Sequence, residues 1–173
     1  MAHATFDATP TSGVGRIRVK IEVNVVEVEP CFGRTTIPLA VDSPWWRGDA
    51  EIGTFVTEEL LGTKLRALYQ RNKGRDLFDL WHALTALDPD DERTIAAFEH
   101  YMGAKAFTFP EFSANLRAKL EDRDFRGDLA QLVTELPEAY DPDRAADAVI
   151  ERLGARLAGA PDLSEKGDGA WRD

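Results

Sequence analysis

Apolar and polar residues alternate strictly along residues 16–25 of this 173-residue chain, with an apolar side chain at every second position from Ile17. A period of two is typical of a β-strand that buries one of its faces. The apolar character continues to Val28, and residues 30–33 contain the proline and glycine of a turn. The pattern therefore predicts a strand over residues 16–28 with one face in a core.

The segments on either side of this strand have weaker patterns. Residues 1–15 contain a proline and two glycines, which indicate an extended piece followed by a turn. Residues 35–41 are rich in β-branched side chains, and we expect them to return antiparallel to the first strand. We expect a loop at 44–48 and a short apolar link at 52–56 before the pattern changes.

From Thr57 onward the apolar residues recur with the period of an α-helix. Thr57 is predicted to cap the first helix, because a threonine side chain can accept a hydrogen bond from the first free backbone amides. Leu61, Leu65 and Leu68 form its apolar stripe, and Gly74 is expected to end it. This helix is the first element of a back half that contains only helices.

The second helix follows directly and is predicted to stop at residues 88–89, where an aspartate precedes a proline. Its apolar stripe consists of Leu77, Leu80, Trp81 and Leu84. Further helices are predicted at 91–102, 110–120, 124–136 and 142–157. The chain is thus expected to be an α+β protein, with a β region at 1–56, a helical region at 57–158 and a loosely ordered tail at 159–173.

Composition and charge narrow the possible functions. Hydrophobic residues make up 43% of the chain, which is enough for the core of one ordinary domain. The net charge of −10 argues against a protein that binds nucleic acid over its whole surface, because phosphate contacts require basic side chains. No run approaches the roughly 18 apolar residues of a membrane span, and no targeting signal is apparent, so we expect a cytoplasmic protein. Cys31 has no second cysteine to pair with and is interpreted as an ordinary residue.

Basic residues are concentrated between positions 64 and 75, whereas carboxylates become frequent after residue 88. Lys64 flanks the apolar stripe of the first helix, and a tight turn at 73–74 can fold the two helices into a hairpin. Asp76 and Asp79 share one face of the second helix, so the hairpin is expected to bring them near Lys64. The sequence therefore predicts a close set of opposite charges between these two helices.

This set has two interpretations. In the first, the charges are a salt-bridge network that fastens the helices, and Asp76 helps to cap the second helix. In the second, the cations hold a triphosphate while a carboxylate orients Lys64 or assists with a metal ion. The cations of the second interpretation are Lys64, Arg71, Lys73 and Arg75.

Glu22 is a further candidate, on the polar face of the predicted strand between Lys20 and Asn24. Its carboxylate could point into a cleft beside the sheet and bind a metal ion. The alternative is a solvated strand face.

The segments VKIEVN (19–24) and EELLGTKLRALYQRNKGRDLFDLW (58–81), and more loosely FRGDLAQLV (125–133), resemble the AbiEii/AbiGii toxins, a branch of the nucleotidyltransferase superfamily. The second segment is the specific one, since the family pattern of a lysine, an Ala-Leu pair, an arginine and R-D-L-x-D-L is present as Lys64, Ala67, Leu68, Arg71 and residues 75–80. The resemblance implies a partial nucleotidyltransferase-like antiparallel or mixed sheet, followed by an α-helical bundle.

The resemblance also implies an activity and a site. Such toxins transfer a nucleotide from an NTP, with Mg²⁺, onto an acceptor for which the tRNA 3′ end is the leading candidate, and a cognate antitoxin protein restrains them in phage defence. Lys64 and Asp79 match the family's lysine and aspartate, and Asp76 lies beside them as a candidate catalytic residue. Glu22 would lie where the third acidic ligand of the metal site belongs.

The residues ahead of the strand depart from the superfamily pattern, because they contain neither the Gly-Ser turn nor the paired carboxylates of the D-x-D motif. This departure suggests a front-truncated member, and two alternatives follow. The chain is either an inactive remnant that keeps nucleotide, RNA or antitoxin binding, or its reading frame starts late and the missing strand is encoded upstream. A truncated sheet can expose an edge, so self-association into a homo-oligomer is also expected.

Overall fold

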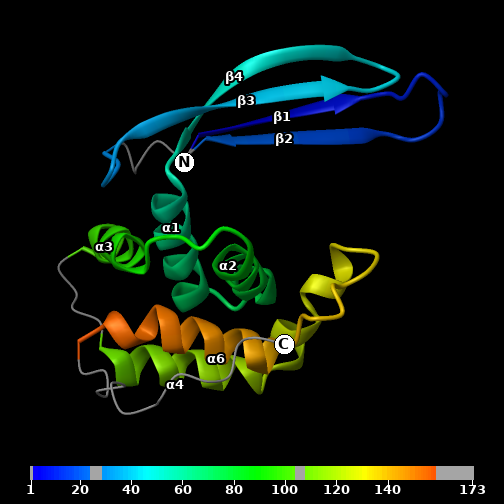
Figure 1. Cartoon of the computed structure of the whole chain (residues 1–173). Coiled ribbons are helices and arrows are strands. Elements are labelled where there is room, and N and C mark those ends of the chain that lie inside the picture. Colours follow the sequence, from blue (N-terminus) through cyan, green and yellow to red (C-terminus); the bar gives the residue numbers. More distant parts are fainter. Residues whose placement is uncertain (1, 24–28, 104–107, 159–173) are drawn as a thin grey trace. The chain divides into compact units, whose positions relative to one another are not determined.

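The computed structural model describes residues 2–23, 29–103 and 108–158. It is an α+β protein in which two antiparallel two-stranded sheets precede the helices (Figure 1). The chain divides into two compact units, Met1–Pro30 and Cys31–Asp173, and the division falls inside the β region expected at 1–56. Within the described ranges no helix is long and apolar enough to cross a membrane. The expected tail at 159–173 and residues 24–28 of the predicted strand lie outside the described residues.

The first unit contains a β-hairpin made of β1 (Ala2–Ala8) and β2 (Ile17–Val23). The extended piece expected near the N-terminus is β1, and it pairs with the predicted strand so that Phe6 lies opposite Val19 and Ala4 opposite Ile21. This register places the apolar side chains of both strands on one face. The prediction that this face is buried was wrong for the described residues, since Val19 and Ile21 remain 46% and 49% exposed.

The second hairpin consists of β3 (Arg34–Asp42) and β4 (Arg47–Phe55). The return strand predicted at 35–41 exists, but its partner is β4 and not β2, and the apolar link expected at 52–56 is mostly the end of β4. A tight turn joins the strands, in which the Ser43 Oγ accepts from the Trp46 amide at 3.1 Å and donates to its carbonyl at 2.9 Å. β3 therefore pairs with β4 across a short turn, which closes at a lower entropic cost than a longer connection.

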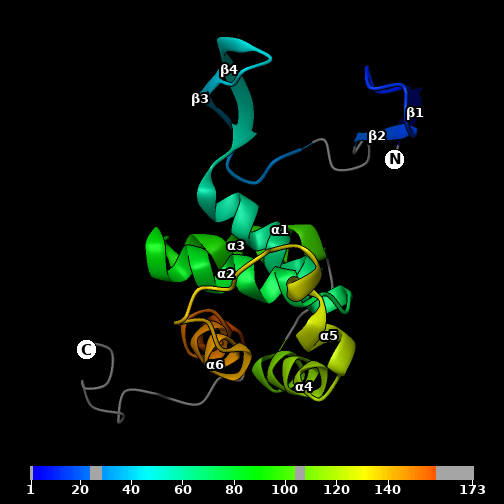
Figure 2. The ribbon, with the colours of Figure 1, turned by 90° about the vertical axis from the view of Figure 1, so that its right-hand side faces the viewer.

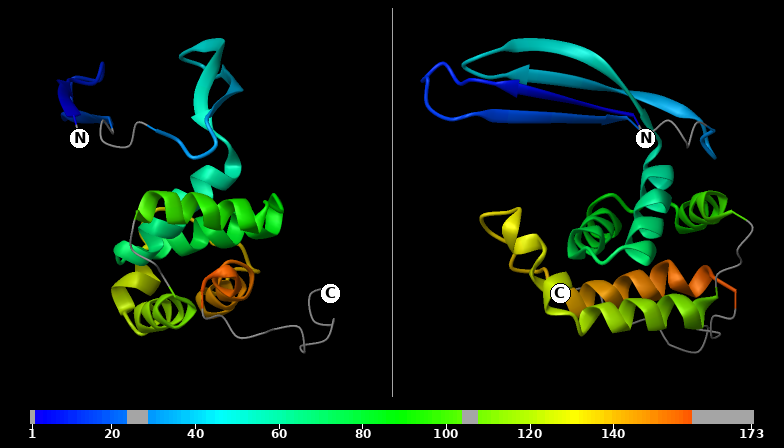
Figure 3. Two further views of the ribbon diagram at one scale, coloured as in Figure 1. Left: turned by 90° about the vertical axis from the view of Figure 1, so that its left-hand side faces the viewer. Right: turned by 180° about the vertical axis from the view of Figure 1, so that it is seen from behind.

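The helices form the hydrophobic core. They are α1 (Thr57–Gln70), α2 (Gly74–Ala86), α3 (Asp91–Met102), α4 (Phe109–Leu120), α5 (Arg123–Gly127) and α6 (Pro142–Arg152). Seen along their axes, α4 and α6 lie side by side under the layer of α1, α2 and α3 (Figures 2 and 3). The predicted stripes of α1 and α2 are buried between these layers, with only Trp81 partly exposed, which confirms the helical periodicity.

Four helix boundaries differ from the prediction. Gly74 was expected to end α1, but α1 ends at Gln70 and Gly74 is the first residue of α2. The helix predicted at 142–157 ends at Arg152 and is followed by a 3₁₀ turn at Gly154–Arg156. The N-cap of α1 is Val56, and no side chain caps this end, so the predicted Thr57 cap was wrong. The helix predicted at 124–136 is only α5 and a 3₁₀ turn at Leu129–Gln131. Its later apolar residues, Leu132 and Leu136, are exposed, so no apolar stripe supports a longer helix.

Close backbone packing at Gly74 fixes the start of α2. A Cβ atom at this position would lie 2.1 Å from the carbonyl oxygen of Phe125 in α5, far inside van der Waals contact. The obstacle is backbone, which cannot turn away as a side chain can. Gly74 therefore allows α5 to approach the first turn of α2.

Replacing Gly74 with alanine is expected to lower the free energy of unfolding by about 1–3 kcal/mol, because α5 must move away from α2. Urea unfolding followed by circular dichroism measures the change. Gly127→Ala is the matched control, since a Cβ there meets no atom within 4 Å. Equal stability of the two variants would show that the contact relaxes without cost.

Candidate functional site

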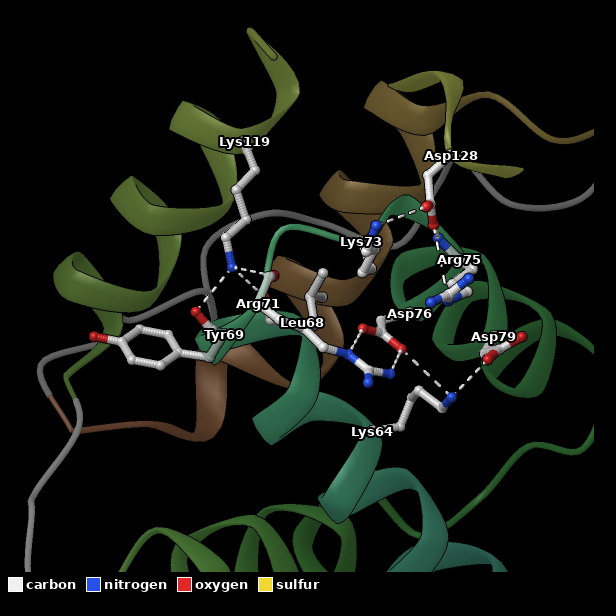
Figure 4. Close-up of polar contacts among 10 residues, drawn as sticks. All are labelled: Lys64, Leu68, Tyr69, Arg71, Lys73, Arg75, Asp76, Asp79, Lys119 and Asp128. Atoms are coloured by element: carbon white, nitrogen blue, oxygen red, sulfur yellow. Dashed lines mark hydrogen bonds and ion pairs between the residues drawn. The ribbon is translucent and has the colours of Figure 1, made fainter. Parts of the chain in front are cut away.

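The turn between α1 and α2 brings Lys64 to the first turns of α2. Arg71 has an extended backbone that ends α1, and α2 begins three residues later. The Lys64 Nζ lies 2.7 Å from Asp79 Oδ2 and 3.4 Å from Asp76 Oδ1 (Figure 4). The hairpin thus brings together the lysine and both aspartates on which the sequence hypothesis rests, while their chemical roles stay a prediction.

Arg71 neutralises Asp76 with a bidentate ion pair. Its Nε donates to Asp76 Oδ2 at 2.6 Å and its Nη2 donates to Oδ1 at 2.7 Å. Asp76 is fully buried, whereas half of the Arg71 side chain is exposed. The hydrogen bond to Asp76 raises the pKa of Arg71, so this guanidinium remains charged. Both oxygens of Asp76 are therefore committed to cations of α1 and its terminal turn.

A second charge cluster is centred on Asp128, which the sequence hypothesis did not include. Its Oδ2 accepts from the backbone amide of Arg75 at 3.3 Å, and its Oδ1 lies 3.4 Å from Lys73 Nζ. Asp128 thus accepts a hydrogen bond from a free amide at the start of α2. The N-cap residue, Lys73, makes no side-chain capping hydrogen bond. The prediction that Asp76 helps to cap α2 was wrong. The only sequence signal for Asp128 is its place in the FRGDLAQLV segment.

Lys119 of α4 is a second residue that the sequence hypothesis missed. Its Nζ donates to the carbonyl oxygen of Leu68, to that of Tyr69 at 2.8 Å and to that of Arg71 at 3.0 Å (Figure 4). These carbonyls belong to the C-terminal end of α1, where a cation is favourable. Burial lowers the pKa of Lys119 to about 8, and the charge of Asp76 opposes this shift. Lys119 therefore holds the backbone from which Arg71 reaches Asp76.

The predicted cations reach the surface around the hairpin. Lys64 is 31% exposed, and Lys73 and Arg75 are more exposed still. The charges around Lys64 and those around Asp128 together include four cations, which form ion pairs with the carboxylates of Asp76, Asp79 and Asp128. Since Asp76 is buried and already paired, the exposed part of this set is predominantly positive, which suits an anionic ligand.

The carboxylates near Lys64 do not fit a magnesium site. Both oxygens of Asp76 face cations, and an Asp79 oxygen contacts the Lys64 ammonium. Among the residues that the structure describes, no three histidine, cysteine, aspartate or glutamate side chains form a metal-binding group.

Glu22 lies on the polar face of β2 with its carboxylate 2.5 Å from Lys20 Nζ, and the hydrogen bond from Lys20 lowers the pKa of Glu22.

Comparison with known proteins gives the family. The family model of the nucleotidyl transferase AbiEii toxin of type IV toxin–antitoxin systems matches residues 2–152. Comparisons with curated proteins and with solved structures gave no match. The family match covers most of the chain, including β1, β2 and the charged helix hairpin. This chain therefore belongs to the AbiEii family of nucleotidyltransferase-like toxins of type IV toxin–antitoxin systems.

Proposed function

We propose that this toxin transfers a nucleotide from an NTP onto an acceptor hydroxyl, with the 3′ end of a tRNA as the acceptor. The observation that carries the proposal is the position of Lys64, a partly exposed ammonium between a buried and an exposed aspartate. Lysine is a compact point charge that binds phosphate well. A lysine that served packing alone would not need a carboxylate on either side of its ammonium.

In the proposed reaction the acceptor oxygen forms a bond to the α-phosphorus of the NTP. The bond from that phosphorus to the oxygen bridging to the β-phosphate breaks, pyrophosphate leaves, and the hydroxyl proton passes to solvent. Lys64 and Arg75 bind the phosphates and stabilise their negative charge. Asp79 orients the Lys64 ammonium, and the Arg71–Asp76 pair holds the two helices at the required spacing.

A second candidate function is binding without transfer. The observation that favours it is the engagement of both Asp76 oxygens by cations, which leaves this carboxylate unsuited to a metal ion. In this case the chain keeps nucleotide, RNA or antitoxin binding. Mg²⁺ enters the proposal as the ion that accompanies the NTP in the assay, and no step is assigned to it.

Labelling separates the two candidates. The protein is incubated with each of the four α-labelled NTPs, Mg²⁺ and total tRNA, and the RNA is then resolved on a denaturing gel. Label at the tRNA 3′ end is the expected result. NTP binding without any labelled RNA would favour the binding function, and the absence of both would contradict the proposal.

Replacing Lys64 with alanine is expected to weaken NTP binding about tenfold or more, since a charge-assisted contact to phosphate is lost. Isothermal titration calorimetry measures the dissociation constant, and circular dichroism checks that the variant is folded. Arg117→Ala is the control, because Arg117 is an exposed cation of α4 that pairs with Asp147. If both variants bind NTP like the wild type, Lys64 serves only the salt-bridge network that fastens α1 to α2.

The family implies an antitoxin partner for this chain. We propose in addition that the toxin acts in the cytoplasm in phage defence, and that it self-associates. Light scattering of the purified chain tests the last point, since a monomeric mass at high protein concentration would exclude it.

A further inference from the structure

The outer face of α2 carries an aromatic surface beside the charged site. Arg75, Phe78, Asp79 and His82 follow the helical spacing of one face, on which residues three and four positions apart are neighbours. His82 is exposed and Phe78 is half-buried. Phe78 lies at the edge of the helical core, where it contacts Trp81 at 5.8 Å and keeps part of its ring exposed.

The ring of Phe78 is held by other aromatic side chains. It is stacked against His82 with a centroid distance of 6.0 Å and an interplanar angle of 4°, and it meets Tyr140 edge-on at 5.0 Å. Trp81 contacts Tyr140 at 5.1 Å, and both of these rings pack against the core. Phe78 and His82 therefore present ring surface, and the aromatic side chains that hold Phe78 are fixed to the core.

The charges next to this aromatic surface are those of the proposed NTP site. Asp79, the residue after Phe78, holds the Lys64 ammonium at 2.7 Å. Arg75 lies one turn before Phe78 on the same face, so their Cβ atoms are about 5–6 Å apart. Ring faces and phosphate-binding cations at this spacing match a nucleotide, in which a sugar separates the base from the phosphates.

We propose that Phe78 and His82 form the surface on which the nucleobase of the NTP stacks, while Lys64 and Arg75 bind its phosphates. This inference rests on the proposed function and adds the residues that contact the nucleobase. Aromatic rings stack on the π-face that every base has, so they contribute affinity with little discrimination among bases. The toxin is accordingly expected to bind all four NTPs through this surface, and purines more tightly because they offer more ring area.

The experiment compares NTP with inorganic tripolyphosphate, which has the charges and lacks the base. Phe78→Ala is expected to weaken ATP binding about tenfold and to leave tripolyphosphate binding unchanged. Lys64→Ala is expected to weaken both ligands. Phe78→Trp should restore ATP binding, whereas Phe78→Leu, which keeps apolar bulk without a ring face, should not. Leu87→Ala, an exposed apolar residue at the end of the same helix, is the control.

The outcomes separate the two proposals. ATP binding by Phe78→Ala that equals that of the wild type would overturn the stacking surface, even if Lys64→Ala loses both ligands. Equal weakening of ATP and tripolyphosphate by Phe78→Ala would assign Phe78 a structural role and overturn it as well. A loss of tRNA binding with unchanged ATP binding would assign the surface to an RNA base and contradict the inference. Wild-type binding of both ligands by Lys64→Ala would instead contradict the proposed phosphate site.

Discussion

Replacing Arg71 with methionine is expected to lower the free energy of unfolding by about 3 kcal/mol. Methionine keeps most of the apolar stem but removes both donors of the bidentate pair. Asp76 is fully buried and would then face only the Lys64 ammonium, 3.4 Å from Oδ1 and shared with Asp79. A buried carboxylate that loses its bidentate partner is costly, because no water replaces the two lost hydrogen bonds and one shared ammonium compensates only in part.

Denaturant unfolding followed by tryptophan fluorescence measures this effect. Arg117→Met is the matched control, since the Arg117–Asp147 pair is also close, at 2.5 Å, but both side chains are about half exposed. Exposed pairs contribute about 0–1 kcal/mol, so the control should remain near the wild type. The double variant Arg71→Met with Asp76→Leu should regain most of the lost stability, because it removes the unpaired charge. A double variant as unstable as Arg71→Met would show that the unpaired Asp76 carboxylate is not the cause of the lost stability.

The sequence was sufficient to predict the part of the fold that is built from local periodicity. The apolar stripes of α1 and α2 recur every three or four residues, and the same stripes are buried in the structure. The proximity of Lys64 to Asp76 and Asp79 could also be predicted, because a tight turn links two adjacent helices. That prediction required only one assumption, namely that residues 73–74 form a tight turn.

Contacts between distant segments could not be predicted in the same way. Asp128 reaches the start of α2 and Lys119 reaches the end of α1 from about 50 residues away along the chain. Neither residue carries a periodic signal, and their partners include backbone atoms, which leave no trace in the sequence. The pairing of β3 with β4 was missed for another reason, since alternation identifies a strand but not its partner.

Glu59 shows the same limit at one position, because its side chain is buried although it is a charged residue in the first turn of α1. Its Oε1 accepts from the Cys31 amide at 2.7 Å and from the Tyr101 hydroxyl at 2.5 Å, and its Oε2 accepts from the Phe32 amide at 2.9 Å. Glu59 thus links the segment before β3 to α1 and α3. Three donors depend on one carboxylate.

Replacing Glu59 with alanine is expected to lower the free energy of unfolding by about 3–5 kcal/mol, since each donor left without a partner costs about 1–3 kcal/mol and some regain water. Thermal and urea unfolding measure the change. Glu58→Ala is the matched control, because the preceding residue carries the same charge at the same helix end without being buried. Equal stability of the two variants would show that the three donors find other acceptors.

The contribution of Glu59 is also expected to depend on pH. Burial alone raises the pKa of Glu59, but the hydrogen bonds from Tyr101, Phe32 and Cys31 outweigh it, so its pKa lies below the ordinary 4.5. A carboxyl with a lowered folded-state pKa stabilises the fold above the unfolded-state value, and this stability is lost as the pH falls through the folded-state pKa. Glu59→Gln removes the titration while keeping the shape. The difference in unfolding free energy between wild type and Glu59→Gln should therefore be constant near neutral pH and shrink below pH 4.5. A difference that does not change between pH 7 and pH 3 would show that Glu59 has the same pKa in both states.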